Sequence, residues 1–381
     1  MKAKSIKGSS PVDIANQITE CISWEFTPTL AIVFISTKQD IEKMATILDE
    51  KKISYFGVTS GGEFIDGEIG QGTIAVMLLN IDPAYFKVTL RETGNSTTEE
   101  ISKQIGAEGK RLFARPAFII ATAGGLNDSE KIVNGIEEAA GTEVMLFGGG
   151  GVDDAHFSVS GAFVFSNGKI SNDGLVAIIL DEDKISINGL ATCGWKPVGT
   201  LRTVTKSIGN EIYTIDHEPA LDLVLKYLGV KFDLDSAAEV LMNIGAYFPL
   251  QIQRENAEPI MRSVMSVNQE ARSLVCVGNV QQGSKLRFSL PPDFEVIDQV
   301  VQDCAELKDT RQNQADVVIM FSCQMRLFSF GATISQEIER VQEIWNCPMI
   351  GFFTAGEIGK SKRGKTEFHN NTCCVAVLKE K

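Results

Sequence analysis

The chain has 381 residues, of which 44% are hydrophobic and 22% are charged. These fractions are those of an ordinary globular protein and exclude long disordered tracts, and the length predicts two or three domain-sized units. The net charge is −13, from 36 Lys and Arg against 49 Asp and Glu. Because such a charge repels phosphate backbones and anionic lipids, we expect neither nucleic acid nor membrane as a partner.

The N-terminus and the apolar runs indicate where the protein works. No apolar segment follows the lysines of residues 1–11, so we expect no signal peptide. Apolar runs such as residues 30–35 and 175–180 are far shorter than the ~20 residues of a membrane-spanning helix. The eight cysteines are scattered, without a CxxC pair, which is typical of reduced thiols. We therefore expect a cytoplasmic location.

Apolar strand-like runs alternate with amphipathic helical stretches, which is typical of α/β structure. The first stretch has Ser10 at a helix N-cap and Pro11 at the first helical position. The order helix, strand, helix, strand, strand is predicted for residues 12–23, 30–36, 40–51, 55–60 and 73–79.

The same order is predicted twice more along the chain. The second copy comprises residues 97–113, 117–123, 129–140, 144–147 and 175–180, and the third 294–307, 316–323, 335–345, 349–353 and 372–378. Residues 184–280 interrupt the pattern with strand-like segments and one helix near 219–228. Three copies indicate a repeated α/β module. We predict layered mixed sheets in two domains, residues 1–220 with two modules and residues 221–381 with the third.

A small, glycine-rich loop ending in a carboxylate follows the corresponding strand of each module. Residues 57–63 (GVTSGGE) align with 351–357 (GFFTAGE), and 148–154 (GGGGVDD) occupy the same place in the second module. Ligands of open α/β sheets bind at the carboxyl ends of strands, where small residues let the backbone approach. We therefore predict a ligand site formed by Ser60, Gly61, Gly62, Glu63, Gly149, Gly150, Asp153, Asp154, Thr354, Gly356, Glu357, His369 and Asn370. The alternative interpretation is that the glycines only form turns and the acids cap their loops.

The glycine runs do not match phosphate-binding motifs. The P-loop frame would require glycine at Thr354, and the dinucleotide fingerprint would require it at Asp153 or Asp154. Esterase and caspase nucleophile motifs do not occur. An enzyme would have to use the loop carboxylates as general acid and base, so a binding protein is the favoured interpretation.

The chain has three histidines, His156, His217 and His369, none at HxxxH or HExxH spacing. The sequence thus gives no support to a zinc site. Each histidine remains a candidate axial ligand for haem, which needs one imidazole in an apolar pocket. The alternative is an ordinary hydrogen-bonded side chain at each position.

Residues 349–359 (MIGFFTAGEIG), followed by 368–372 (FHNNT), strongly resemble the signature of the FIST C-terminal domain. Other segments resemble the FIST N-terminal domain and its junction, namely residues 57–63, 147–154, 194–199, 212–216 and 219–222. The resemblance spans nearly the whole chain. One position departs from it, because His217 stands where the family pattern commonly has glycine.

The resemblance implies a sensory, ligand-binding module of signal transduction, which in bacteria is often fused to or encoded beside histidine kinases, chemotaxis receptors or cyclic-di-nucleotide enzymes. Stand-alone members that are similar in layout are described as haem-binding nitric oxide sensors that control a partner kinase. No F-box-like or kinase segment is expected here, so a separate partner would carry the output. We expect a sensor of a small polar molecule such as an amino acid. Haem-based nitric oxide sensing is the alternative, and an enzyme using the loop carboxylates is the weaker one.

Overall fold

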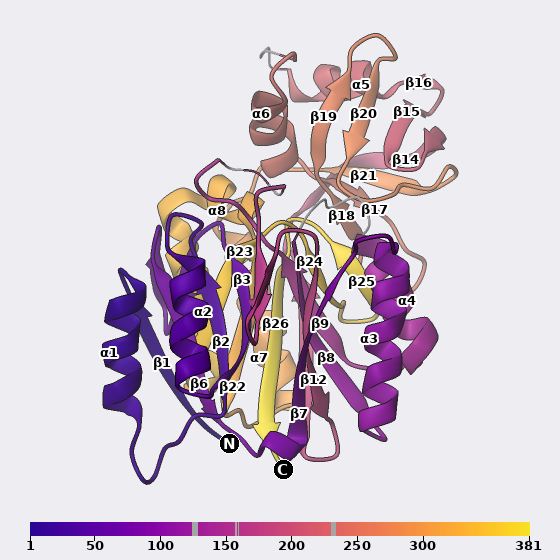
Figure 1. The fold of residues 1–381 in the computed structure, drawn as a ribbon. Coiled ribbons are helices and arrows are strands. Elements are labelled where there is room, and N and C mark those ends of the chain that lie inside the picture. The colour runs from indigo at the N-terminus through magenta and orange to yellow at the C-terminus, as the bar shows by residue number, and fades with distance from the viewer. Residues whose placement is uncertain (124–128, 157, 159, 230–233) are drawn as a thin grey trace.

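The computed structural model describes residues 1–123, 129–156, 158, 160–229 and 234–381 (Figure 1). The first module comprises β1 (Lys2–Gly8), α1 (Pro11–Cys21), β2 (Leu30–Ile35), α2 (Ile41–Glu50), β3 (Ser54–Thr59), β4 (Glu63–Ile65), β5 (Glu68–Gly70) and β6 (Ile74–Asn80). After the turn η1 (Pro83–Tyr85), the second comprises β7 (Phe86–Glu92), α3 (Thr98–Leu112), β8 (Pro116–Ala123), α4 (Ser129–Ala140), β9 (Leu146–Gly150), β10 (Val164–Ser166), β11 (Lys169–Ser171) and β12 (Gly174–Asp181). The third comprises β13 (Ile185–Thr192), α7 (Phe294–Thr310), β22 (Val317–Cys323), α8 (Gln324–Phe330), η4 (Gly331–Thr333), α9 (Ile334–Trp345), β23 (Met349–Thr354), β24 (Glu357–Lys360), β25 (Thr366–His369) and β26 (Cys373–Glu380).

The predicted α/β class and the repeated module are confirmed. Local signals explain where the helices begin. Ser10 caps α1 by accepting a hydrogen bond from the Asp13 N–H at 3.2 Å, with Pro11 at the first helical position. Thr97 and Glu100 form a capping box at the start of α3.

Each module contributes strands to two sheets, because its hairpin pairs with the sheet of a neighbouring module. The sheet orders are β1-β6-β2-β3-β10-β11, β7-β12-β8-β9-β24-β25 and β13-β26-β22-β23-β4-β5. The first module's hairpin β4–β5 thus extends the third module's sheet, the second module's β10–β11 extends the first, and the third module's β24–β25 extends the second. The three modules exchange hairpins in a closed ring and form one body.

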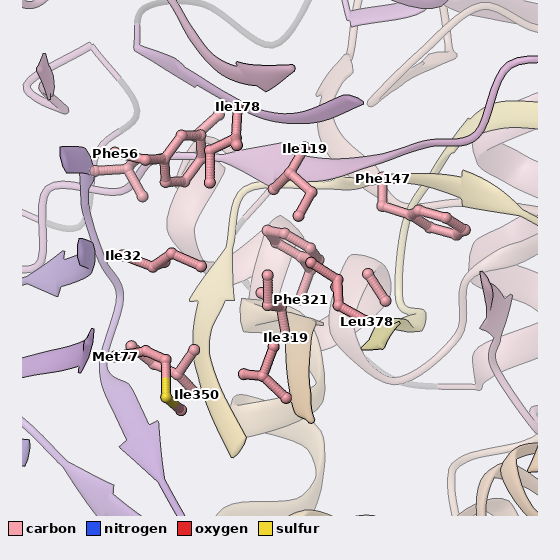
Figure 2. Packing of buried hydrophobic residues seen from close by; sticks show 14 of the residues in the cluster. Ile32, Phe56, Met77, Ile119, Phe147, Ile178, Ile319, Phe321, Ile350 and Leu378 are labelled. Carbon is pink, nitrogen blue, oxygen red and sulfur yellow. The ribbon is translucent and has the colours of Figure 1, made fainter. Parts of the chain in front are cut away.

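The three sheets face one another across a shared apolar core. Figure 2 shows side chains of all three modules meeting there, including Phe56, Phe147 and Phe321. The rings of Phe34 and Phe352, from the first and third modules, lie 4.4 Å apart between centroids. Truncating a buried phenylalanine in such a core costs about 3–5 kcal/mol, so the modules depend on one another for stability.

The helices cover the outer faces of the three sheets, and each pair encloses a core of its own. The helices α1 and α2 pack on the first sheet, α3 and α4 on the second, and α7 and α9 on the third (Figure 1). In β2, for example, Ile32 and Phe34 point to the shared core, whereas Val33 and Ile35 point to the helices. Both faces of the strand are buried, so it reads as a continuous apolar run.

A second domain is inserted between β13 and α7 and stands apart from the ring of modules (Figure 1). Its strands are β14 (Pro197–Ile208), β15 (Glu211–Ile215), β16 (Glu218–Pro219), β17 (Leu250–Ile252), β18 (Ile260–Arg262), β19 (Val264–Asn268), β20 (Ser273–Cys276) and β21 (Lys285–Ser289), and its helices are α5 (Ala220–Leu228), α6 (Ala237–Val240) and the π-helix η3 (Leu241–Ala246). It has its own hydrophobic core, which includes Leu221, Ile244 and Leu286. The proposed sequence division after residue 220 stays a prediction. In space, the described residues of 197–229 and 234–289 form the inserted domain, and the third module already begins at β13.

The hairpin exchange explains the first glycine of the strand-end loops. A Cβ on Gly57 would lie 2.3–2.5 Å from ring atoms of Phe165, which belongs to the hairpin received from the second module. Gly351 stands in the same relation to Phe64, with 2.1 Å to the ring. At both places the exchanged hairpin lays an aromatic ring directly over a glycine.

We expect Gly57→Ala to lower the free energy of unfolding by about 1–3 kcal/mol, because the added methyl group overpacks the Phe165 ring. The measurement is urea denaturation. The cost should shrink when Phe165→Leu is also present, and equal costs in both backgrounds would contradict this account of the contact.

Candidate functional site

The strand-end loops of the three modules meet at one end of the body and are joined by backbone hydrogen bonds. The bonds run from Gly61 N–H to Phe353 O (3.0 Å), from Gly150 N–H to Gly356 O (3.0 Å) and from Val152 N–H to Thr59 O (3.1 Å). Gly62 and Gly356 have φ angles of 128° and 91°, a region that favours glycine. Gly149 packs on Thr354, whose Cγ2 would lie 2.6 Å from an added Cβ. The lack of a side chain at these glycines therefore lets the loops of neighbouring modules pack closely and bond through their backbones.

Glu63 is fully buried at the start of the hairpin strand β4. Its carboxylate accepts hydrogen bonds from Ser60 Oγ at 2.6 Å and from the Thr73 N–H at 2.8 Å, and it also contacts the Thr73 hydroxyl. Thr73 immediately precedes β6. The side chain therefore ties the start of the exchanged hairpin to the strand that follows it.

Glu357 repeats this arrangement in the third module, at the start of β24. Its buried carboxylate accepts from Thr354 Oγ1 at 2.5 Å, from Thr372 Oγ1 at 2.6 Å and from the Thr372 N–H at 3.3 Å. Thr372 precedes β26 as Thr73 precedes β6. Two glutamates predicted to face a ligand thus have protein hydroxyls and amides as their partners.

Burial raises the pKa of both Glu63 and Glu357 to about 7, from an ordinary value of 4.5. Desolvation disfavours the charged carboxylate, and the hydrogen bonds that each one accepts offset only part of that effect. Both groups consequently change charge near neutral pH.

In the second module Asp153 and Asp154 occupy the corresponding loop and point toward the first module. Asp154 accepts from Ser36 Oγ at 2.7 Å and from the Thr37 N–H at 2.9 Å. Asp153 accepts from Thr37 Oγ1 at 2.6 Å and contacts His156 Nδ1 at 2.8 Å. Although desolvation acts to raise the pKa of Asp153, the hydrogen bonds from Thr37 and His156 hold it below its ordinary value.

The three histidines lie in separate places. His369 is buried and hydrogen-bonded through Nε2 to Gly359 O at 3.1 Å, and desolvation lowers its pKa to about 4, which keeps it neutral at pH 7. His156 has an 80% exposed side chain, and His217 is exposed. Among the described residues, no group of three or more His, Cys, Asp or Glu is placed to hold a metal ion.

A cavity of about 660 Å³ lies between the body and the inserted domain; we call it the interdomain cavity. Its apolar lining includes Leu241, Met242, Met265 and Val277 from the inserted domain and Met325 and Phe328 from α8 of the body. Its polar lining consists of Ser158, Ser160, Ser263, Gln324, Thr354 and Asn370. No Lys, Arg, Asp or Glu lines it among the residues that the structure describes. Such size and chemistry suit a small organic ligand.

Three of the predicted site residues, Thr354, Gly356 and Asn370, line the interdomain cavity. The other predicted residues lie outside its lining: Ser60, Gly61, Gly62, Glu63, Gly149, Gly150, Asp153, Asp154, Glu357 and His369. Sequence reasoning missed Gln324, at the start of α8, and the wall supplied by the inserted domain. Residues 184–280 are marked in the sequence only by the interruption of the repeat, so nothing there indicates that they face the strand-end loops.

Hydrogen bonds at the rim of the cavity hold the inserted domain against the segment after β25. The Ser263 N–H donates to Asn370 Oδ1 at 3.3 Å, and the Ser263 hydroxyl contacts Asn371 Oδ1. Asn371 Nδ2 donates to Gly245 O and Ala246 O of the π-helix η3, at 3.1 and 3.2 Å. Single π-turns frequently occur at functional sites. Ser263 and Asn370 thus line the cavity and also connect the two domains, and Asn371 adds bonds beside them.

Arg326 of α8 bonds to two segments that connect the body with the inserted domain. Its fully buried guanidinium pairs with the equally buried Glu337, with Nε 3.0 Å from Oε1. Nη1 donates to Cys193 O and Asn371 O, both at 2.9 Å, and the group lies 5.0 Å from the Trp195 ring centroid. One side chain therefore holds the segment that leads into the inserted domain and the segment that lines the cavity.

A second, polar cleft of about 610 Å³ lies among α4, β18 and β25. Arg262, which is 4% exposed, pairs there with Glu130 of α4 at 2.6 Å and donates to Phe368 O at 3.1 Å. The Asn279 side chain donates to the same glutamate at 2.6 Å. This cleft provides a further link between the inserted domain and the second module.

Two family models match the chain. The FIST N domain matches residues 29–218, and the FIST C domain matches residues 220–360. The chain belongs to the FIST family. FIST domains are associated with sensory roles in signal transduction. A search of curated proteins found no match to this chain. In the described ranges, none of the helices combines the length and apolar character needed to cross a membrane.

The backbone at His217 lies in a region that favours glycine. This residue has a φ of 68°, the left-handed region that a glycine adopts without strain. Its N–H donates to Thr205 Oγ1 at 2.9 Å. His217 therefore holds a left-handed turn without being a glycine and adds an exposed imidazole there.

The raised pKa values of Glu63 and Glu357 predict that the stability of the protein depends on pH. A carboxyl group with a pKa of about 7 in the folded state and 4.5 when unfolded binds its proton more tightly when folded. Its contribution to the free energy of unfolding is therefore full below pH 4.5 and is lost as the pH rises to 7. At 1.36 kcal/mol per pKa unit, each glutamate accounts for about 3 kcal/mol.

We expect Glu63→Gln/Glu357→Gln to gain stability relative to wild type as the pH rises from 4.5 to 8, because only wild type loses the proton-linked contribution, as measured by urea denaturation. The matched control is Glu50→Gln, at an exposed glutamate of α2. A difference from wild type that stays constant from pH 4.5 to 8 would argue against titration of the buried pair.

Arg326→Met should lower the free energy of unfolding by about 3–5 kcal/mol, because it leaves the Glu337 carboxylate buried without its cation. Arg326→Met/Glu337→Met should recover much of that loss, since both charges are then removed. Chemical denaturation of the two variants measures the difference. If the double variant is no more stable than the single one, the backbone hydrogen bonds of Arg326 outweigh the ion pair.

Proposed function

We propose that this FIST protein is a sensor that binds a small molecule in the interdomain cavity and passes the event to a separate signalling partner. One observation carries the proposal: the inserted domain and the body each supply one wall of the cavity. A ligand there touches Met242 of one domain and Phe328 of the other. Because a ligand shifts an equilibrium only by its differential affinity for two states, a shared site is where binding favours one domain orientation.

The described lining favours an uncharged ligand over an amino acid. Transferring a charged ammonium or carboxylate group out of water requires an opposite charge or several hydrogen bonds in return. The described polar groups of the cavity are hydroxyls and amides, such as Ser263, Thr354 and Asn370. An amino acid, which the loop carboxylates suggest from the sequence, would reach neither Glu63 nor Glu357 without breaking their internal hydrogen bonds.

Haem sensing of nitric oxide gains no support from the described residues. A haem iron needs an imidazole that faces an apolar cavity. His369 is bonded to Gly359 O, while His156 and His217 are exposed, and none of the three lines the interdomain cavity. The residues present do not fit the group, so we assign no step to it. We also propose no reaction, because the buried glutamates are engaged within their own loops.

The output that we propose is a change in the surface formed jointly by the two domains, read by a signalling protein such as a histidine kinase. The family resemblance supports this class of partner. The inserted domain is joined to the body through two short segments, residues 193–196 and 290–293. Its orientation relative to the body is therefore the property that we propose the ligand changes. A partner that contacts both domains would sense that orientation.

The proposal is tested by filling the cavity. Ala238 lines it and is itself exposed, so Ala238→Phe should occupy ligand space without disturbing a core. Native mass spectrometry of the purified protein should show a bound small molecule in wild type and a loss of at least about tenfold in occupancy in the variant.

The matched control is Ala332→Phe, at an exposed alanine of η4 that does not line the cavity. It should retain the ligand. A compound that stays bound to Ala238→Phe as firmly as to wild type would place the site elsewhere.

A further inference from the structure

Methionines gather in the interdomain cavity. The chain has ten of them, and five are fully buried in hydrophobic cores, namely Met44, Met77, Met261, Met320 and Met349. Three half-buried ones, Met242, Met265 and Met325, line the interdomain cavity. They come from η3 and β19 of the inserted domain and from α8 of the body. Three partly accessible methionines from two domains therefore share one site.

The chemistry open to these side chains is oxidation at sulfur. A peroxide transfers one oxygen atom to the thioether: the S–O bond forms and the O–O bond breaks. The sulfur is oxidised, the peroxide is reduced, and the rest of a hydrogen peroxide molecule leaves as water. The product is a sulfoxide, which is polar and which methionine sulfoxide reductases convert back to the thioether. The reaction is thus reversible, and it requires that the peroxide reach the sulfur.

Access separates the cavity methionines from the buried ones. A cavity of about 660 Å³ admits a molecule as small as hydrogen peroxide. Met320 and Met349 lie instead in the neighbouring strands β22 and β23 and have no exposed surface, so a peroxide reaches them only when the structure opens locally. Met145 is half-buried against the shared core and does not line the cavity. It provides an accessible methionine at another place.

A sulfoxide changes what the cavity can bind. In the empty cavity, water can solvate the new oxygen. A largely apolar ligand displaces that water, and the neighbouring side chains, such as Leu241, Val277 and Phe328, offer no hydrogen-bond donor in return. Burying a polar group without a partner costs free energy. Oxidation therefore opposes the binding of an apolar ligand.

We propose that Met242, Met265 and Met325 form an oxidation site, at which a peroxide produces sulfoxides that weaken the binding of an uncharged ligand. The inference rests on the proposed function and adds an input to it. The protein then responds both to its ligand and to an oxidant, and both act on the cavity that the two domains share.

The first test is the order of oxidation. The full chain is dialysed free of small molecules and treated with hydrogen peroxide, and mass spectrometry of its peptides follows each methionine. The three cavity methionines should react at least about tenfold faster than Met320 and Met349, whose reaction waits for a local opening. Equal rates in the two groups would overturn the oxidation site.

The second test follows binding of Nile red, an uncharged dye whose fluorescence rises in apolar surroundings. Peroxide should weaken its binding to wild type about tenfold, the effect of one polar group left without a partner. Met242→Leu/Met265→Leu/Met325→Leu keeps an apolar lining without sulfur and should bind the dye equally before and after peroxide. Met145→Leu is the matched control and should lose affinity as wild type does.

A further variant guards against poor folding of the triple one. Met242→Gln places a polar amide where the sulfoxide would form, so it should bind Nile red weakly without any peroxide. Circular dichroism checks that each variant is folded.

The outcomes separate this inference from the proposed function. If the cavity methionines are oxidised and wild type still binds Nile red as tightly, with binding lost in Ala238→Phe, the inference fails and the cavity remains a binding site. If the dye binds Ala238→Phe as tightly as wild type and no compound co-purifies, the proposed function fails. The order of oxidation decides the modification site in either case.

Discussion

The exchange of hairpins between modules is the constraint on which the rest of the structure depends. Each module supplies four strands of its own sheet and relies on a neighbour for the last two. Closure of the ring brings three sheets face to face, and the shared core with Phe34 and Phe352 follows from it. A module by itself would leave an open sheet edge and an exposed apolar face, so the three are expected to fold as one unit.

The same constraint explains the glycine and acid pattern of the strand-end loops. In the first and third modules the first glycine, Gly57 or Gly351, admits an aromatic ring of the received hairpin, and the glutamate, Glu63 or Glu357, anchors the hairpin that is sent out. Part of the acidity of the chain is therefore buried at joints between modules. The internal hydrogen bonds of these carboxylates agree with the interpretation that the acids cap their loops. Thr354 and Asn370 line the cavity, whereas Glu63 and Glu357 do not.

The sequence predicts the central strands and the helices well because their signals are long. β2 is a six-residue apolar run and α2 has a regular apolar face. The hairpin strands span only three or four residues, such as β4 and β10, too few for a period to show. β1 alternates lysines with small and apolar residues and carries no signal of burial on both faces. The exchange itself and the place of Gln324 in the cavity lining are tertiary features, since pairing between distant loops leaves no local pattern.

In the proposed function, the segment between β25 and β26 couples the cavity to the domain arrangement. On one side the Ser263 N–H of the inserted domain donates to Asn370 of this segment, and on the other Arg326 of the body binds Asn371 O. Asn370 of this segment also lines the cavity. Hydrogen bonds worth about 0.5–1.5 kcal/mol each join the domains at the rim, beside the apolar contacts that Met261 and Val277 make with the body. A change in two or three of them matches the roughly 1–3 kcal/mol typical of coupling between sites. In the proposed function, binding energy of that size would act on these bonds and so on the orientation of the inserted domain.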